Sequence, residues 1–203
     1  MREHPVFARF YEWISPKLDE AGERDHRIEV VSGARGRVLE VGSGNGLNFE
    51  HYRDTNLVVA LEPEPTMLRI AARRAREAPV PVRFVRGVGE RLPFADGSFD
   101  TLVVSLVLCS VRDPRRAVAE LARVLRPGGE LRYLEHVRSA SPVGALVQDA
   151  MTPVWSLFSG GCHPNRDTTA TLRGAGFHVE GRRFPFGPPT PARPHVLGVA
   201  RKA

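Results

Sequence analysis

Three glycines at alternate positions follow an apolar run that contains an acid, and this segment carries the most direct chemical information in the chain. It reads VLEVGSGNG from Val38 to Gly46, with the acid at Glu40. The apolar run is typical of a buried parallel strand, and the glycines let the chain turn sharply with no Cβ to keep a ligand from the backbone. A strand that leads through a glycine turn into a helix places backbone N–H groups beside a nucleotide cofactor.

The glycine spacing distinguishes between two classes of cofactor. A dinucleotide fingerprint needs its third glycine three residues after the second, but that position is Leu47, and the third glycine comes one residue earlier. A nicotinamide cofactor is therefore disfavoured. The acid at Glu40 and the alternate glycines closely resemble those of class I S-adenosylmethionine (SAM) methyltransferases.

Further segments extend this resemblance to a whole cofactor site. Glu62 ends the second strand, where an acid binds ribose hydroxyls in nucleotide-binding α/β folds. The loop 87–94 resembles the segment around the adenine, although Val88 stands where an acid or Asn is usual, so backbone groups must bind the adenine there. The fourth strand ends where the methionine part of SAM should lie. The expected cofactor residues are Glu40, Gly42, Ser43, Gly44, Gly46, Glu62, Pro63, Val88, Gly89, Glu90, Ser105 and Leu106.

A narrower resemblance points to the acceptor. The runs LVLCSV and RVLRPGG recur with the segments 135–137 and 148–155 in one subfamily, and over about 37–201 the chain resembles the small alkyl thiol S-methyltransferases. This implies transfer of a methyl group from SAM to the sulfur of a small, fairly apolar thiol, with S-adenosylhomocysteine as product. Two alternatives stay open: methylation of oxygen, nitrogen or carbon in a quinone, lipid or secondary metabolite, and SAM binding without turnover.

Few residues are needed for chemistry on a thiol, because a thiol with a pKa near ~8.5 is already a few per cent thiolate at neutral pH. His136 ends the fifth strand and is the first candidate to deprotonate or orient the acceptor; His163 and Arg166 follow in an irregular segment that could cover the site. The expected substrate pocket contains Phe7, Tyr11, Cys109, Trp155 and Cys162. No CxxC or Cys/His group has zinc spacing along the chain, so no metal is expected.

The elements that must position these residues alternate between strand and helix, which predicts an α/β fold with a parallel sheet. Strands are expected over 37–41, 57–61, 82–86, 101–104, 130–135, 177–184 and 195–201. Helices are expected over 6–14 and 18–32 (interrupted at Ser15 and Pro16), 47–52, 66–77 with Thr66 as N-cap, 114–125, 142–160 (broken by Pro153) and 166–175. The resemblance implies a seven-stranded, mostly parallel Rossmann-like sheet of order 3-2-1-4-5-7-6, with the last strand antiparallel, helices on both faces and a helical lid.

Length and composition set the remaining bounds. The 203 residues suit a single methyltransferase domain over 1–203, with 1–34 as an N-terminal helical lid and 140–170 as a cover segment. The net charge is +6, but almost all the basic residues are scattered Arg, so no nucleic acid is expected.

Two cysteines and no signal sequence favour the cytoplasm. The longest apolar run, 101–111, is far shorter than the ~20 residues that span a bilayer, so no stable membrane insertion is expected. The oligomeric state stays open.

Overall fold

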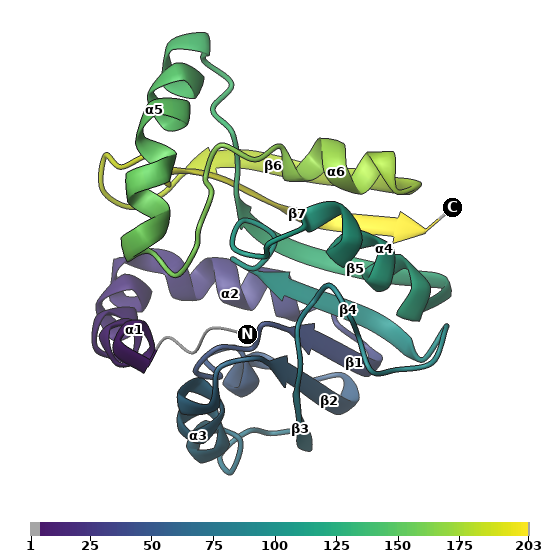
Figure 1. The fold of residues 1–203 in the computed structure, drawn as a ribbon. Helices are drawn as coiled ribbons and strands as arrows, with labels where there is room; N and C mark the ends of the chain where they lie inside the picture. Colours follow the sequence, from purple (N-terminus) through teal and green to yellow (C-terminus); the bar gives the residue numbers. More distant parts are fainter. Residues whose placement is uncertain (1–4, 203) are drawn as a thin grey trace.

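Seven strands form one sheet in the computed structural model, which describes residues 5–202 (Figure 1). The strands are β1 (Gly36–Val41), β2 (Thr55–Glu62), β3 (Val82–Arg86), β4 (Phe99–Ser105), β5 (Leu125–His136), β6 (Phe177–Pro185) and β7 (Pro194–Lys202). Their order is β3-β2-β1-β4-β5-β7-β6; β7 is antiparallel to both neighbours, and the remaining pairs are parallel. The predicted Rossmann-like sheet, its strand order and its antiparallel last strand are confirmed.

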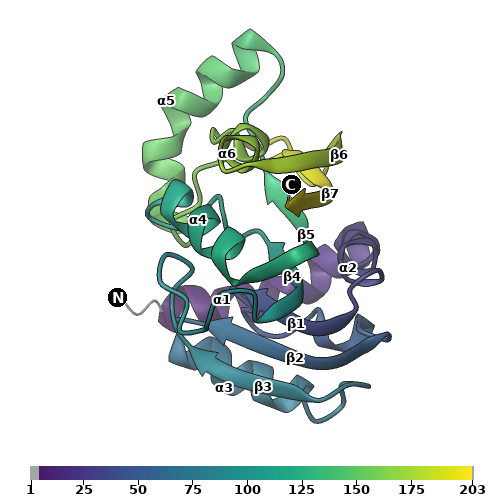
Figure 2. The same ribbon diagram turned by 90° about the vertical axis from the view of Figure 1, so that its right-hand side faces the viewer.

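Helices cover both faces of this sheet, because successive side chains of a strand point to opposite sides. They are α1 (Pro5–Leu18), α2 (Arg24–Val31), α3 (Pro65–Arg74), α4 (Pro114–Val124), α5 (Pro142–Phe158) and α6 (Thr168–Gly174). Val38 packs in a core with residues of α2 and α3, whereas Leu39 packs in a second core with residues of α4 and α6. Figure 2 shows α2 and α4 on opposite sides of the sheet.

Two predicted helix breaks are wrong. The first helix continues through Pro16 to Leu18, and the carbonyl of Glu12, which a proline leaves without its helix donor, accepts a 3.5 Å hydrogen bond from the Ser15 hydroxyl. The chain bends instead at Gly22, whose φ is 111°, within a short π-helical turn, Asp19–Glu23. Likewise α5 continues through Pro153, because a proline removes only one hydrogen bond from a long helix.

Two other local expectations need correction. The helix expected over 47–52 is only a 3-10 turn, Phe49–His51. The N-cap of α3 is Glu64, not Thr66: the Glu64 carboxylate accepts a 3.0 Å hydrogen bond from the Thr66 N–H. Asp113 caps α4 as its position before Pro114 predicts, by accepting from the Arg116 N–H at 3.0 Å.

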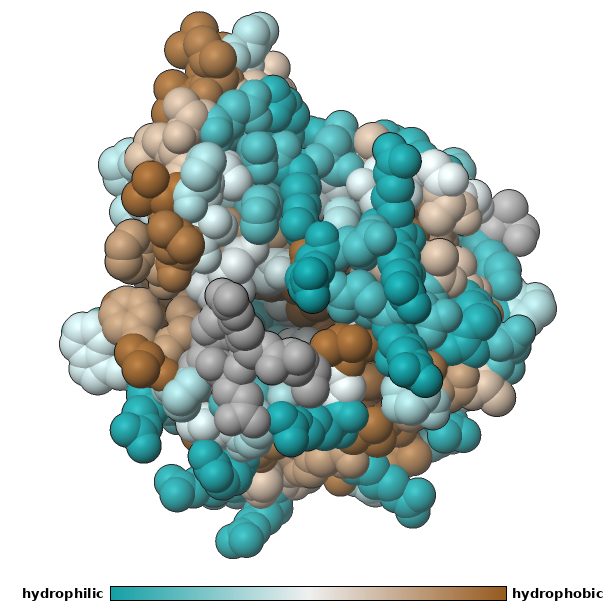
Figure 3. Space-filling view, in the orientation of Figure 1, coloured by the Kyte–Doolittle hydropathy of each residue, from teal (hydrophilic) through white to brown (hydrophobic). Residues whose placement is uncertain are grey.

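Large apolar side chains gather on the surface along α1 and α5. In Figure 1 α5 stands out from the sheet, and Figure 3 shows apolar residues along the edge of the molecule that it forms. The exposed side chains on these two helices are Val6, Phe10, Trp13, Val143, Leu146, Val147, Met151, Val154, Leu157 and Phe158. Within residues 5–202 no helix has the length and apolar character needed to cross a membrane.

Candidate active site

A large cavity of about 2280 Å³ lies at the carboxyl ends of β1, β2, β4 and β5, the edge at which open α/β sheets bind their ligands. Residues of α1 and α5 complete its wall. The sequence-predicted residues that line it are Phe7, Tyr11, Glu40, Gly42, Ser43, Gly44, Glu62, Pro63, Val88, Gly89, Glu90, Ser105, Leu106, Cys109, His136, Trp155 and Cys162. Gly46, His163 and Arg166 are the predicted residues that do not line it.

The glycine turn after β1 forms one wall of the cavity. The N–H groups of Gly42 and Ser43 both donate to the Leu61 carbonyl, at 2.7 and 3.2 Å, which ties the turn to β2. A Cβ on Gly42 would lie 2.5 Å from Val107, whereas a Cβ on Gly44 would meet no heavy atom within 4 Å. Gly44 also has a φ of 55°. It therefore leaves a cradle that a side chain would fill, as close approach of a ligand to the backbone requires.

Gly46 has a different role from Gly44. A Cβ there would lie 2.7 Å from the ring of Phe49, and its φ is 83°. It does not line the cavity. Its lack of a side chain lets the turn pack on the core below, so it shapes the turn without facing the ligand.

Two buried acids lie beside the turn, and their hydrogen bonds differ. The Glu62 carboxylate accepts from the N–H groups of Gly44 and Glu64, each at 2.9 Å. Burial raises the pKa of Glu62, and these backbone bonds oppose the rise. The backbone bonds fix the carboxylate at the cavity wall, as the predicted ribose contact requires.

Glu40 is bonded to the protein through both of its oxygens. One accepts from the Asn48 amide at 2.8 Å and the other from the Tyr52 hydroxyl at 2.9 Å. Burial raises the pKa of Glu40 to about 7, although both of these hydrogen bonds act to lower it. Glu40 lines the cavity, and its bonds to residues after the glycine turn give it a positioning role there.

The loop after β3, where the adenine contacts are predicted, lines the cavity. Val88 and Gly89 line the cavity, and Val88 forms an isolated antiparallel bridge with Arg91. The Glu90 carboxylate accepts from the N–H of Arg112 at 2.8 Å, which ties this loop to the start of α4. The side chain of Glu90 therefore helps to hold the cavity wall, of which Val88, Gly89 and Glu90 are all part.

The exit of β4 has an unusual backbone. Leu106 has a φ of 59°, the one non-glycine residue with a positive φ within 5–202. Such conformations cluster at functional sites. The Glu135 carboxylate fixes the residues that follow by accepting from the N–H groups of Val107, Leu108 and Cys109 at 2.8, 2.8 and 3.1 Å. Sequence reasoning assigned Glu135 no role, although an acid at the carboxyl end of a buried strand could have indicated one.

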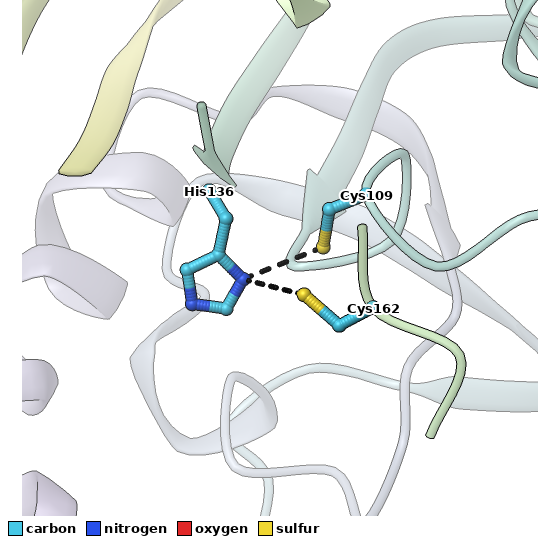
Figure 4. A group of neighbouring side chains, drawn as sticks. All are labelled: Cys109, His136 and Cys162. Atoms are coloured by element: carbon cyan, nitrogen blue, oxygen red, sulfur yellow. Dashed lines mark hydrogen bonds between the residues drawn. The ribbon is translucent and has the colours of Figure 1, made fainter. Parts of the chain in front are cut away.

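A cluster of two thiols and an imidazole lies in the cavity wall next to this exit (Figure 4). The Nδ1 atom of His136 is 3.5 Å from the sulfur of Cys109 and 3.3 Å from that of Cys162. Both cysteines are buried and free. The sequence left open whether the cysteines approach each other, and the structure brings them together.

The three groups influence one another's protonation. Donation from the Cys109 thiol, followed by the contact with His136, lowers the pKa of Cys162. The same sulfur–sulfur contact, together with burial, raises the pKa of Cys109. Burial acts to lower the pKa of His136, but the hydrogen bond to Cys162 and the negative charges of Cys162 and Glu135 together raise it. A negative charge on Cys162 and a positive charge on His136 therefore support each other.

The other two predicted catalytic residues lie behind the cavity wall. The His163 N–H donates to the Cys109 carbonyl at 2.7 Å. The Arg166 guanidinium donates to the carbonyls of Leu108 and Val111, both at 2.7 Å. Because neither residue lines the cavity, these bonds argue against direct catalysis by His163 and Arg166 and make both of them positioning residues.

The two helices that complete the wall give the cavity an apolar mouth. Phe7 and Tyr11 of α1 and Trp155 of α5 line it, as predicted. Four exposed apolar side chains line it as well: Phe10, Met151, Val154 and Phe158. This composition favours a small molecule with an apolar body.

Two arginines that the sequence gave no reason to single out fix α1 over the site. Buried Arg27 donates to the Tyr11 hydroxyl at 3.0 Å and forms ion pairs with Asp19 and Glu23. Arg74 forms a two-pronged ion pair with Glu12 of α1, at 2.8 and 3.0 Å. A scattered helical arginine carries no local pattern that would have predicted either contact.

Taken together, these features fit SAM. The glycine cradle, the acid at Glu62 and the buried hydroxyls of Ser43 and Ser105, which have no hydrogen-bond partner within residues 5–202, offer contacts along one edge of the sheet. A sheet of this order with such a site defines a class I SAM-dependent methyltransferase.

Comparison with known proteins places the chain within that class. A family model described as a methyltransferase domain matches residues 39–133. The chain is 37% identical to thiol S-methyltransferase TMT1B of Homo sapiens, over 93% of this chain and 83% of that protein. It is 35% identical to a demethylmenaquinone methyltransferase of Renibacterium salmoninarum, over 61% and 56% of the two chains. The chain belongs to the family of SAM-dependent methyltransferases that includes the thiol S-methyltransferases, and SAM is its cofactor.

A solved structure shows the same fold. A SAM-dependent methyltransferase from Thermotoga maritima superposes with a TM-score of 0.69 at 22% identity, covering 98% of each chain. The relatives in sequence confirm the predicted class of enzyme, and the nicotinamide alternative is set aside.

Proposed function

We propose that this enzyme transfers the methyl group of SAM to the thiol sulfur of a small, fairly apolar molecule. The observation that carries the proposal is the similarity to a thiol S-methyltransferase over 93% of the chain. The apolar mouth formed by Phe10, Met151, Val154 and Phe158 supports an acceptor with an apolar body.

The residues around the acceptor have little chemistry to supply. SAM, when bound, carries the methyl group on a sulfonium sulfur and so supplies the reactive bond. The chain must orient the acceptor sulfur and favour its thiolate form, which is a few per cent of a free thiol at neutral pH. His136 is the polar side chain at the cavity end of β5 that is placed to do this. The acceptor thiol gives up its proton to solvent, its sulfur gains the methyl group, and the products are a neutral methyl thioether and S-adenosylhomocysteine.

We also propose roles for the segments that cover the site. The N-terminal segment 1–34, of which residues 5–34 lie in the described part of the chain, forms a lid through α1 and α2. The segment 140–170 forms a cover through α5 and the loop that carries Cys162. Both contribute side chains to the cavity wall, and Arg27 and Arg74 hold α1 in place. A single methyltransferase domain over 1–203, located in the cytoplasm, is part of the same proposal, and the free thiols of both cysteines agree with a reducing compartment.

One alternative acceptor class has a specific observation in its favour. The similarity to a demethylmenaquinone methyltransferase supports a quinone or a related carbon or oxygen acceptor. An acceptor of that kind has a greater need for a general base than a thiol has. The acid beside His136, Glu135, accepts three backbone hydrogen bonds in the loop and is not placed to serve as that base.

A panel of acceptors tests the proposal. Purified protein is incubated with SAM and with matched compounds (1-propanethiol and 1-propanol, thiophenol and phenol, and a demethylated quinone), and methylated products are identified by mass spectrometry. We expect products from the thiols only. Methylation of the phenol or the quinone with none on any thiol would overturn the proposal.

A further inference from the structure

Transfer of a methyl group to a free thiol does not require the close approach of Cys109, His136 and Cys162. We propose that these three residues bind one zinc ion, and that its fourth coordination position faces the cavity and takes the sulfur of the acceptor. The zinc site stands on its own geometry, whereas the identity of the fourth ligand rests on the function proposed above.

The distances match those of a tetrahedral site. Zinc lies about 2.3 Å from thiolate sulfur and about 2.0–2.1 Å from imidazole nitrogen, so tetrahedral angles place sulfur about 3.6 Å from nitrogen and about 3.8 Å from sulfur. The observed sulfur–nitrogen distances are 3.5 and 3.3 Å, and the three donor atoms all lie within 4.8 Å of one another. An ion at the centre of this triangle would need only small adjustments of the side chains.

The donor set selects the kind of ion. Two thiolates and one imidazole favour zinc over the hard cations magnesium and calcium, which prefer oxygen ligands. Structural zinc sites in proteins have four protein ligands, whereas catalytic sites keep one position open for water or substrate. Three donors that all line the cavity therefore indicate the second type.

The three ligands come from separate parts of the chain, and each is held by its own contacts. Cys109 lies in the loop after β4, where its N–H donates to Glu135 and its carbonyl accepts from His163. Cys162 follows α5, and its N–H donates to the Ser159 carbonyl at 3.1 Å. His136 ends β5 and is paired in the sheet with His195. Such outer contacts orient ligands before an ion binds.

The proposed fourth ligand fits the reaction. The acceptor thiol would lose its proton to solvent as its sulfur binds zinc, and the ion would keep its oxidation state throughout. The bound sulfur remains a thiolate at neutral pH, which is the nucleophilic form that the transfer needs. Figure 4 shows the two sulfurs and the imidazole of His136 pointing toward a common point.

Metal content and optical spectroscopy test the site directly. Full-length protein is stripped with a chelator under anaerobic conditions with a phosphine reductant, reloaded with Zn²⁺ or Co²⁺ alone, and freed of excess metal. We expect about one zinc per chain, and for cobalt the intense visible bands of a tetrahedral site with sulfur-to-cobalt charge transfer. Absence of stoichiometric metal, or a cobalt spectrum without thiolate bands, would overturn the site.

Variants assign the ligands. Cys109→Ser, Cys162→Ser and His136→Ala should each weaken zinc binding by more than about 100-fold, since loss of an outer partner alone costs 10- to 100-fold. His178→Ala is the matched control, because His178 is an exposed histidine of β6 outside the cluster. Affinity retained in all three ligand variants would contradict the proposal. Should a variant fail to fold, as judged by circular dichroism, the cobalt spectrum of the unchanged protein still decides.

A final measurement separates the metal proposal from the proposed function. Addition of 1-propanethiol to the cobalt protein without SAM should shift the charge-transfer bands, whereas 1-propanol should not. No shift with the thiol would overturn the open position as its binding site, whatever the enzyme methylates. Conversely, stoichiometric zinc together with methylation of phenols only would leave the metal site standing and refute the thiol acceptor.

Discussion

The backbone N–H of Gly44 donates a 2.9 Å hydrogen bond to the carboxylate of Glu62. This bond joins the turn after β1 to the acid that ends β2, although the residues are 18 positions apart in the chain. It places the glycine motif and the distant acid side by side in the cavity wall. We expect the cofactor to occupy the open space beside Gly44, with the Glu62 carboxylate fixed at its edge.

Substitution at the cradle should remove cofactor binding. In Gly44→Asn the new side chain would occupy space in which no atom lies within 4 Å of the Cβ position. Asn tolerates a positive φ better than most residues, so the backbone strain is small. We expect SAM affinity, measured by calorimetry, to fall by at least about tenfold, which is about 1.4 kcal/mol.

Gly176→Asn is the control for that substitution. Gly176 has a φ of 88° and equally open surroundings, but it follows α6 away from the cavity. Both variants should melt within about 2–4 °C of the unchanged protein if each costs about 1 kcal/mol. Unchanged SAM affinity in Gly44→Asn would show that the turn is not the cofactor site.

Glu40 should make stability depend on pH. Burial raises the pKa of Glu40 from 4.5 to about 7, so the folded state keeps a proton that the unfolded state loses within this interval. The folded state then binds more protons than the unfolded state, and the contribution of Glu40 to stability falls as pH rises from 4.5 to 7. The full effect is about 3 kcal/mol at 1.36 kcal/mol per pH unit.

Glu40→Gln isolates this effect, because it keeps the shape of the side chain and cannot ionise. Urea unfolding of both proteins at several pH values should show the variant gaining about 3 kcal/mol relative to the unchanged protein between pH 4.5 and 7. The buried acids Glu62 and Glu135 are present in both proteins and cancel from the difference. Parallel pH profiles for the two proteins would show that burial does not perturb Glu40 in this way.

The ion pair of Glu12 with Arg74 should control the motion of α1. The Arg74 guanidinium also donates to the Asn45 carbonyl at 2.9 Å, so the pair fastens the helix to the glycine turn. Glu12→Ala should speed hydrogen exchange of the α1 amides by about tenfold, which is about 1.4 kcal/mol of local stability, and leave the core strands unchanged. The exposed acid Glu20 provides the control, and equal exchange in Glu12→Ala and Glu20→Ala would refute the fastening role.

Glu135 should contribute to the stability of the folded protein through its hydrogen bonds to the loop 107–109. In Glu135→Gln one carboxylate oxygen becomes an NH₂ group that faces a backbone N–H of the loop 107–109. A buried donor that loses its acceptor costs about 1–3 kcal/mol, and we expect that loss in urea unfolding. The exposed acid Glu180 is the control, since a surface change such as Glu180→Gln stays within about 0.5 kcal/mol. Equal stability of the two variants would contradict the role of Glu135.

The parts of the structure that could be predicted from the sequence depend on short stretches. Apolar runs locate the central strands, whereas the last two strands follow from the family resemblance. The glycine turn follows β1 and Glu62 ends β2, so the edge of the sheet brings them together. The two helix breaks predicted from proline were wrong, because a proline does not always end a helix. Pro16 and Pro153 each remove one hydrogen bond, but neighbouring bonds hold α1 and α5 together.

The sulfur–imidazole cluster could not be predicted in this way. His136 lies 27 residues after Cys109 and 26 before Cys162, so no motif of fixed short spacing links them. Their meeting depends on the path of the chain after α5, which no local pattern determines. For the same reason His163 and Arg166 were expected in the cavity, whereas they bind the backbone of the loop that carries Cys109.

A single molecule that carries both a thiol and a hydroxyl group shows which atom accepts the methyl group. Purified protein is given 4-mercaptophenol and SAM labelled at the methyl carbon, and the product is examined by NMR and mass spectrometry. Thiol and phenol then compete from the same ring in the same cavity, so access and affinity are matched. We expect the S-methyl product alone. Formation of the O-methyl ether with no S-methyl product would contradict it.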